Sequence, residues 1–364
     1  MRARAVLGAF ALAFTPGFNV ANVGAVADQV AQSYGIGLAV VGLFTTGLFI
    51  THAAFQVPMG RLCDRFGARL VGGSGLVIVA CTSAAALGWK QAWFAIAMRL
   101  VVGVGTAAAF VAGAEYMRAT TGSAVAQGIW GAVSMAGGGL ALAVVPLWGS
   151  WRAPFVTAAL VAAAGFVLVA LAPTEPARSP VQRRLPTVFD RRLLPLGAMH
   201  AASFGLSVVI GNWVVTLLHR AGGVSEHVAG LAGALVLFLG VISRPLGGRL
   251  MDRPGLVRAS FIVSGLGIAA LSIAKPLPLA IAAAAVVGIA VGIPMAPAFA
   301  GAQRLRPDAP AAAVGFVNML AAVTILVGTP LLGLTFSLPG DGRIGFLVVA
   351  ALCCLTATVA QARV

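Results

Sequence analysis

The chain has 364 residues, of which 60% are hydrophobic and only 9% charged, and its mean hydropathy is +1.00. This composition excludes a soluble domain, which needs more polar surface. A net charge of +15 would suggest nucleic acid binding in a soluble protein. Here most Lys and Arg residues fall in short connections on one side of the predicted topology, which is the positive-inside pattern.

Twelve apolar segments of about 20 residues follow one another along the chain. They are continuously apolar and do not alternate, which predicts membrane-spanning helices and excludes a barrel. The first segment is interpreted as a retained helix, because no small-residue cleavage site follows it. The predicted spans are 5–27, 37–59, 71–88, 92–114, 124–148, 153–172, 193–218, 228–247, 258–275, 277–300, 309–334 and 343–361. We expect an all-α integral protein of the cell (inner or plasma) membrane, with both termini in the cytoplasm.

One connection is long and divides the chain. Residues 173–192 combine four prolines with five arginines, so they are expected to stay in water as a cytoplasmic linker between an N-terminal half, 1–172, and a C-terminal half, 193–364. "QVPMGRLCDRFG" (56–67) aligns with "RPLGGRLMDRPG" (244–255) at an offset of 188. Parallel repeats of this kind place a substrate site between the halves near mid-membrane.

Three motifs resemble those of the major facilitator superfamily. "GRLCDRFGARL" (60–70) is similar to its signature between spans two and three, and "WRAPF" (151–155) to an element at the start of span six. "RLVVGVGTAA" (99–108) resembles the span-four motif through Arg99, Gly103 and Gly105. The resemblance covers the whole chain. It implies twelve transmembrane helices in two pseudo-symmetric six-helix halves, and a secondary transporter that works by alternating access.

The repeated loop motif predicts a conformational latch. Asp64 can meet a helix N-terminus or an arginine, in a contact that breaks and re-forms. Glu115 is a candidate partner of Arg65 or Arg69. An ordinary cytoplasmic loop under the positive-inside rule is the alternative interpretation. The residues assigned to the latch are Gly60, Asp64, Arg65, Arg69, Glu115, Gly248, Asp252 and Arg253.

Two arginines, Arg99 and Arg244, fall within predicted spans, where insertion costs roughly 2.5–3.5 kcal/mol each. No Asp or Glu lies deep in any predicted span. Arg99 occupies the position of the family's span-four arginine, so we assign it, with Gly103, Gly105 and His200, a coupling or structural role.

The main hypothesis about the substrate depends on Arg244. "ISRPLGGRLMDR" (242–253) resembles span eight of the nitrate/nitrite porters, in which an arginine before proline binds the anion. The second anion-binding arginine of those porters would fall at Gln56, so the substrate is expected to be another monoanion, such as cyanate or a small carboxylate. The alternative is that Arg244 snorkels to the interface and braces the adjacent loop.

Further polar residues are assigned to the substrate site. His52 shares a helix face with Gln56 and can carry protons or serve as a hydrogen-bonding group. Asn19, Asn22, Asn212 and Asn318 are candidate cavity residues or interhelical contacts.

The leading hypothesis is a transporter of a small anion, coupled to a proton or a counter-anion. Efflux of amphipathic drugs is the alternative, although a cation site would favour a buried carboxylate. A non-transporting scaffold or sensor would be expected to add a soluble domain. The sequence shows no catalytic triad, metal cluster or phosphate loop, so we expect no enzyme, no cofactor and no metal. The expected environment is the lipid bilayer, with no nucleic acid partner, and the expected state is a monomer.

Overall fold

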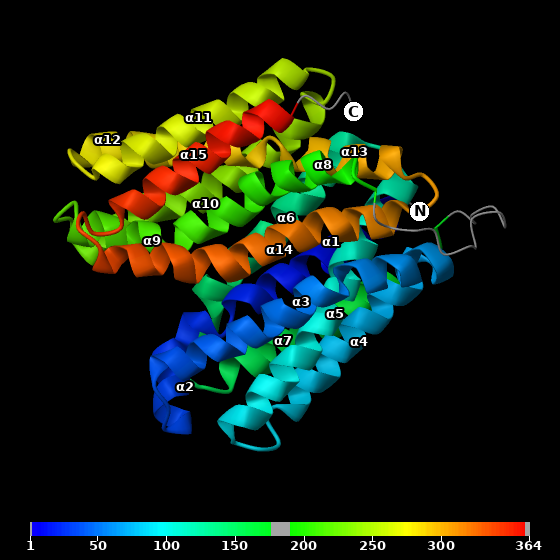
Figure 1. The fold of residues 1–364 in the computed structure, drawn as a ribbon. Helices are drawn as coiled ribbons and strands as arrows, with labels where there is room; N and C mark the ends of the chain where they lie inside the picture. Colours follow the sequence, from blue (N-terminus) through cyan, green and yellow to red (C-terminus); the bar gives the residue numbers. More distant parts are fainter. Residues whose placement is uncertain (1, 176–189, 361–364) are drawn as a thin grey trace. The chain divides into compact units, whose positions relative to one another are not determined.

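The computed structural model describes residues 2–175 and 190–360, and this part of the chain contains helices and no strand (Figure 1). The α-helices are α1 (Arg2–Ala21), α2 (Ala27–Tyr34), α3 (Leu38–Phe66), α4 (Ala68–Ala85), α5 (Ala92–Thr121), α6 (Ala124–Val144), α7 (Ala153–Ala170), α8 (Leu193–His200), α9 (Leu206–Arg220), α10 (Glu226–Arg249), α11 (Pro254–Ile273), α12 (Leu277–Gly292), α13 (Met295–Leu305), α14 (Pro310–Leu334) and α15 (Arg343–Val359). Most of the predicted linker, 176–189, lies outside the described residues.

Eleven helical segments of the described chain are long and apolar enough to cross a bilayer. A twelfth apolar helix, α15, has 17 residues. At 1.5 Å per residue it is about 26 Å long, close to the thickness of the hydrocarbon core. The prediction of an all-α membrane protein is therefore confirmed, and a count of twelve spans agrees with these helices.

The helices differ from the predicted spans at three places. The connection before the second span contains the short helix α2, because Val30 and Tyr34 bury their side chains against Phe44 in an apolar cluster. The tenth span is divided into α12 and α13, next to Pro294, whose ring nitrogen cannot donate a helical hydrogen bond. The seventh span contains a π-helical segment, Ala201–Gly205, between α8 and α9.

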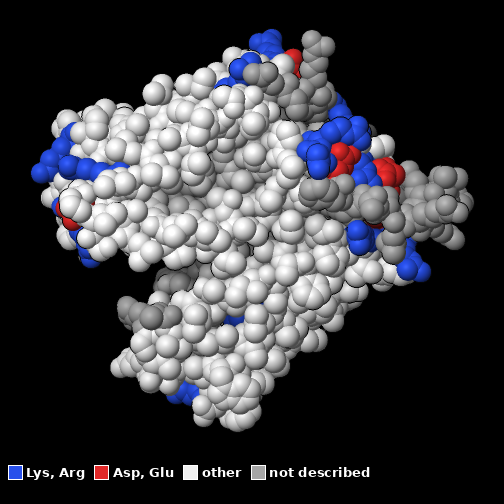
Figure 2. Space-filling view, in the orientation of Figure 1, with Lys and Arg blue, Asp and Glu red and all other residues white. Residues whose placement is uncertain are grey.

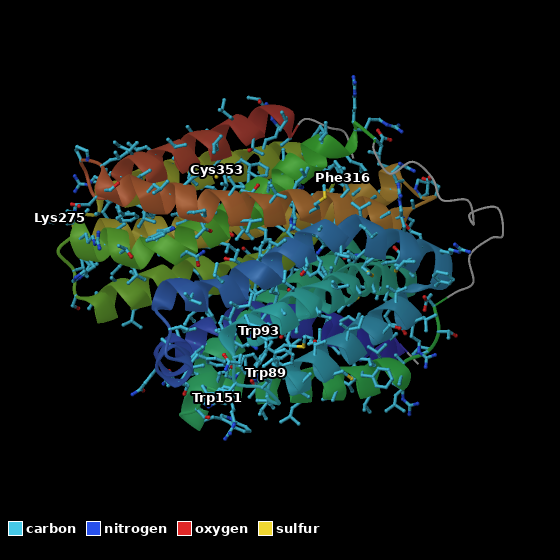
Figure 3. All side chains as sticks on the ribbon, turned by 60° about the horizontal axis from the view of Figure 1, so that its bottom comes forward. Trp89, Trp93, Trp151, Lys275, Phe316 and Cys353 are labelled. Carbon is cyan, nitrogen blue, oxygen red and sulfur yellow. The ribbon has the colours of Figure 1, made fainter. Side chains whose placement is uncertain are left out.

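The surface of these helices is suited to lipid. Large apolar side chains such as Leu147, Phe238 and Leu355 are exposed. Figure 2 shows broad uncharged areas on the visible face, with Lys, Arg, Asp and Glu gathered near helix ends. Trp89 and Trp93 are also exposed, with ring centroids 4.8 Å apart, and Figure 3 shows both rings toward the same end of the N-terminal helices. Tryptophan prefers this position at the boundary between lipid and water.

The described residues group into two compact units. Unit 1 comprises 2–122, 133–175 and 306–319, and unit 2 comprises 123–132, 190–305 and 320–360. Two short segments therefore pack outside the sequence half in which they occur: the start of α6 belongs to unit 2, and the start of α14 belongs to unit 1. The division of the chain at 1–172 and 193–364, which follows the repeat, stays a prediction.

Repeated glycines explain how these two segments pack. A Cβ atom on Gly60 would lie 2.5 Å from Ala312 Cα, within unit 1. A Cβ atom on Gly248 would lie 2.5 Å from the Ala124 carbonyl carbon, within unit 2. Position 60 is the repeat counterpart of 248, and 124 is the counterpart of 312 at the same offset. Only glycine lets the backbones approach this closely.

Replacement of Gly60 by alanine is expected to destabilise unit 1. The added methyl group meets backbone atoms of Ala312 and Ala311, which cannot move aside without displacing α14, so a loss of about 1–3 kcal/mol is expected. Gly42→Ala is the matched control on the same helix, because a Cβ atom there meets nothing within 4 Å. Thermal unfolding of the purified protein in detergent should show a lower midpoint for Gly60→Ala alone. Equal midpoints would contradict the close packing.

Candidate functional site

Arg244, on α10 in unit 2, is 4% exposed. Its Nη1 donates a hydrogen bond of 2.5 Å to the Gly131 carbonyl oxygen on α6, and its guanidinium lies over the Phe204 ring, 5.4 Å from the centroid. Within the described residues, Nε and Nη2 have no hydrogen-bond partner, and no carboxylate forms an ion pair with this side chain. One edge of the guanidinium, formed by Nε and Nη2, is thus left without an acceptor.

Arg99, on α5 in unit 1, is 1% exposed, and each of its side-chain nitrogens donates a hydrogen bond to the protein. Its Nε donates to the Phe44 carbonyl oxygen at 3.3 Å, and its Nη1 and Nη2 donate to Oδ1 and the backbone oxygen of Asn19 at 3.4 and 2.6 Å. These three contacts tie α5 to α3 and α1. Each of the three side-chain nitrogens thus has a protein acceptor. The coupling or structural role of Arg99 stays a prediction.

His52, Gln56 and Asn318 form one buried group in unit 1. The His52 ring makes contacts of 3.0 Å from Nδ1 to Thr106 Oγ1, 2.7 Å from Nε2 to Gln56 Nε2, and 3.5 Å from Nε2 to Asn318 Nδ2. Gly315, on α14, packs against the Gln56 backbone. The residues come from α3, α5 and α14, so the fold brings together three of the predicted substrate residues.

Gly103 and Gly105 hold α5 close to its neighbours. A Cβ atom on Gly103 would collide with backbone and side-chain atoms of α3, and one on Gly105 would lie 2.6 Å from the Gly75 carbonyl oxygen on α4. Thr106 follows these glycines and faces His52 as a consequence of this packing. The sequence does not single out Thr106, which lies within the "GVGTAA" stretch (103–108).

The other asparagines predicted for the substrate site make different contacts. Asn22 donates to the Pro154 carbonyl oxygen at 2.8 Å, which joins α1 to the start of α7. Asn19 is bound to Arg99, and Asn212 is exposed and contacts Thr329 at 3.3 Å.

His200, in unit 2, stacks on Phe204, the ring that also contacts Arg244. Phe204 is thus a site residue that sequence reasoning missed, since an aromatic residue in an apolar span gives no distinguishing signal.

Asp64 contacts a helix N-terminus, one of the two kinds of partner expected for it, and its role in a latch stays a prediction. Its two carboxylate oxygens accept hydrogen bonds from the backbone N–H groups of Ala311 and Ala312, at 3.0 and 2.9 Å, at the N-terminus of α14. These N–H groups have no partner within their own helix, and the helix dipole favours a negative charge there. A residue 247 positions away therefore caps this helix.

The expected partners of the other latch residues need correction. Glu115 forms a two-point ion pair with Arg118, 2.6 Å from Oε1 to Nη2, instead of the predicted pair with Arg65 or Arg69. The reason is proximity, since a residue three positions along a helix is already within reach. Arg65 instead lies over the Phe66 ring, and Arg69 donates to carbonyl oxygens at the end of α7.

The second copy of the motif is used differently. Asp252 and Arg253 are exposed, and Asp252 makes no hydrogen bond within the described residues. The start of α6 is capped by its own Ser123, whose Oγ accepts from the Ala126 N–H at 3.3 Å. Only Gly248 keeps the role of its counterpart Gly60, in close packing against a helix start.

Within residues 2–175 and 190–360, no group of three or more His, Cys, Asp or Glu side chains could hold a metal ion. The chemistry available at these positions is hydrogen bonding, a buried cationic fork and one imidazole. Together with the apolar helices, these features are those of a multi-helix membrane protein with buried polar groups in its spans.

Comparison with known proteins agrees with this class. The family model for the Major Facilitator Superfamily matches residues 9–210. The chain belongs to this superfamily, and it is a multi-pass secondary transporter of a small molecule and not an enzyme.

A protein of Mycobacterium tuberculosis named "Probable nitrate/nitrite transporter NarK2" is 29% identical over 376 residues, which cover 94% of this chain and 92% of the relative. Among solved structures, the proton:xylose symporter XylE has a TM-score of 0.77 at 14% identity, covering 98% of this chain and 94% of that one. The human organic anion transporter MFSD10 has a TM-score of 0.74 at 16% identity, covering 99% of each chain. These structures show the same fold.

Asp64→Asn is expected to destabilise the contact with α14. The amide loses the negative charge that the helix N-terminus favours, and one oxygen of the pair becomes a donor, so the expected loss is about 1 kcal/mol. The control is Asp252→Asn in the second copy, which is exposed and should change the free energy of unfolding by less than about 0.5 kcal/mol. Thermal unfolding of both variants measures the difference. A control that loses as much as Asp64→Asn would refute the capping role.

Proposed function

We propose that this transporter carries a small monoanion and that Arg244 binds it. The observation that carries the proposal is the difference between its two buried arginines. Arg99 donates from all three nitrogens to protein oxygens, whereas Arg244 uses only Nη1. The Nε–Nη2 edge of a guanidinium presents two parallel donors, the geometry that a carboxylate or a similar planar anion accepts.

Energetics support an anion at this edge. A buried donor without an acceptor costs about 1–3 kcal/mol, and more when it is charged, so an arriving anion would remove a penalty as well as add bonds. Phe204 covers one face of the guanidinium, which leaves the planar edge for a ligand. The relative named for nitrate and nitrite transport is consistent with an anionic substrate.

The choice among monoanions follows from Gln56, the repeat counterpart of Arg244. Position 56 of this chain is Gln, where the resemblance to the nitrate/nitrite porters implies a second arginine. One fixed positive charge matches one negative charge, which favours a monoanion such as cyanate, formate or another small carboxylate over a dianion. We further expect the termini to lie in the cytoplasm, from the distribution of Lys and Arg.

Drug efflux is the weaker candidate. Recognition of a lipophilic cation would be helped by a buried carboxylate. Among acidic side chains that the structure describes, Glu115 is the one that is buried, and it is paired with Arg118.

Arg244→Ala should abolish stabilisation by the substrate anion. An anion that binds only the folded protein, present at about 100 times its Kd, adds about 2.7 kcal/mol to wild-type stability. Loss of two charge-assisted hydrogen bonds should weaken binding by at least about tenfold. Thermal unfolding would be measured with nitrate, nitrite, cyanate, formate and the lipophilic cation tetraphenylphosphonium.

Two further variants sharpen this test. Arg244→Lys keeps the charge but lacks the fork, so it should recover only part of the anion effect. Arg249→Ala removes an exposed arginine from the same helix and should behave like wild type. The proposal would be replaced by drug efflux if tetraphenylphosphonium stabilised both wild type and Arg244→Ala and if no anion stabilised either protein.

A further inference from the structure

Two basic residues of unit 1 lie over one aromatic ring. Lys90, between α4 and α5, has its Nζ 5.6 Å from the centroid of the Trp151 ring, and Arg152, directly before α7, has its Cζ 5.2 Å from the same ring's centroid. Both basic side chains are exposed. The face of an indole attracts a cation, and tryptophan is the aromatic residue best suited to this contact. Two separate connections therefore bring two positive charges to one place.

These charges have no acidic partner. Within the described residues, neither the Lys90 ammonium nor the Arg152 guanidinium forms an ion pair or donates a hydrogen bond. The acidic side chains that the structure describes in unit 1 are Asp64, Glu115, Glu175 and Asp308. They stand near the start of α4 and α14 and near the ends of α5 and α7, whereas Lys90 and Arg152 stand at the opposite ends of α4, α5 and α7. An external anion is thus the partner that the two cations lack.

The predicted topology makes this pair of cations conspicuous. In the N-terminal half, the connections on the side expected to face outward contain two basic residues, Lys90 and Arg152, and both of them meet Trp151. The positive-inside rule explains basic residues on the other side of the membrane but not these two. Their convergence on one ring therefore needs another cause.

Trp151 is a fixed support for the two cations. Its half-buried ring lies edge-on to the Tyr34 ring, with centroids 5.2 Å apart, and 6.3 Å from the Phe155 ring. The Tyr34 ring in turn packs against Phe44 at 5.8 Å. A basic residue that only snorkels to the lipid boundary has no such support. Because Trp151 is already ordered, a ligand that binds here orders little of the protein.

Exposed tryptophans provide an apolar surface at the same end of unit 1. Trp89, the neighbour of Lys90 in the chain, and Trp93 are each more than half exposed, and so is Trp148, three residues before Trp151. Figure 3 shows Trp89, Trp93 and Trp151 at one end of the unit 1 helices. Indole rings at the membrane boundary pack against the apolar part of lipid. A ligand with a negative head and apolar tails matches both parts of this surface.

We propose that Lys90, Arg152 and the Trp151 ring bind the phosphate headgroup of an anionic phospholipid, whose acyl chains pack against Trp89 and Trp93. A phosphodiester carries one negative charge and accepts hydrogen bonds from both the ammonium and the guanidinium. The ligand is a lipid and not free phosphate, because a soluble anion would leave the exposed indoles without a partner. The bound headgroup joins the connection before α5 to the start of α7 and so stabilises unit 1. This inference is independent of the anion proposed for Arg244, which lies in unit 2.

The first experiment compares lipids by thermal unfolding of the purified protein in detergent. Phosphatidylglycerol should raise the unfolding midpoint, whereas phosphatidylcholine, whose headgroup has no net charge, and inorganic phosphate should not. Lys90→Gln combined with Arg152→Gln should weaken the binding of phosphatidylglycerol by at least about tenfold, because each basic residue adds to the attraction of an anionic lipid. The matched control is Arg220→Gln combined with Lys275→Gln. It removes two exposed basic residues of unit 2 with the same change in net charge, and it should keep the wild-type rise.

A second experiment locates the lipid without relying on stability. Phosphatidylglycerol or phosphatidylcholine with brominated acyl chains would be added to bilayers that contain the protein, because bromine quenches tryptophan fluorescence on contact. Wild type should be quenched more strongly by the brominated phosphatidylglycerol, and Lys90→Gln combined with Arg152→Gln should be quenched equally by both lipids. Lys90→Arg combined with Arg152→Lys keeps both charges and should restore the preference.

Three outcomes would overturn the inference. Equal midpoints with phosphatidylglycerol and phosphatidylcholine in wild type would leave only an aromatic belt at the membrane boundary. An equal loss of the response in Arg220→Gln combined with Lys275→Gln would reflect general attraction between opposite charges. A rise with inorganic phosphate as large as that with phosphatidylglycerol would replace the lipid by a soluble anion.

Discussion

The absence of water from the hydrocarbon core is the constraint on which this structure depends. Every buried polar group in a membrane-spanning helix must find its partner within the protein, and each one that does not is costly. Ser and Thr side chains here mostly donate to backbone carbonyls, as Thr15 and Thr157 do. Among the buried polar atoms without a partner within the described residues are Arg244 Nε and Gln56 Oε1, and Asn22 Oδ1, Tyr34 Oη and Arg343 Nε are others.

Arg244 and Gln56 occupy a repeat-related pair of positions, and their side chains differ in chemistry. Arg244 has a permanent positive charge and an open fork, which suits direct contact with an anion. Gln56 has no charge, but its amide can present either an oxygen or an NH₂ group. Its neighbour His52 lies 2.7 Å from the Gln56 amide nitrogen. The two copies therefore differ at this position, since one holds a cation and the other a neutral amide.

Close helix packing is a second feature that the repeated loop motif produces. Gly60 and Gly248 let the helix starts of α14 and α6 approach within the two compact units. Only the first copy adds a capping carboxylate, because Asp64 binds two N–H groups of α14 whereas α6 is capped by Ser123. The loop motif occurs twice in the sequence, but only its first copy makes hydrogen bonds to a helix start through its aspartate within the described residues. An asymmetric cap of this kind can break at one helix while the other is unaffected.

The sequence by itself determined the helical membrane class, the approximate spans and the family, since hydropathy and the repeated loop motif are local properties of the chain. It also selected Arg244 and His52 as polar residues in apolar spans, and Gln56 as the position that the resemblance to the nitrate/nitrite porters assigns to a second arginine. Only the tertiary structure decided which of them meet: it joined His52 to Thr106, satisfied Arg99 through Asn19, and paired Glu115 with Arg118. Such partners depend on how helices turn and cross, and one rotation of a helix changes every side-chain contact without altering its hydropathy.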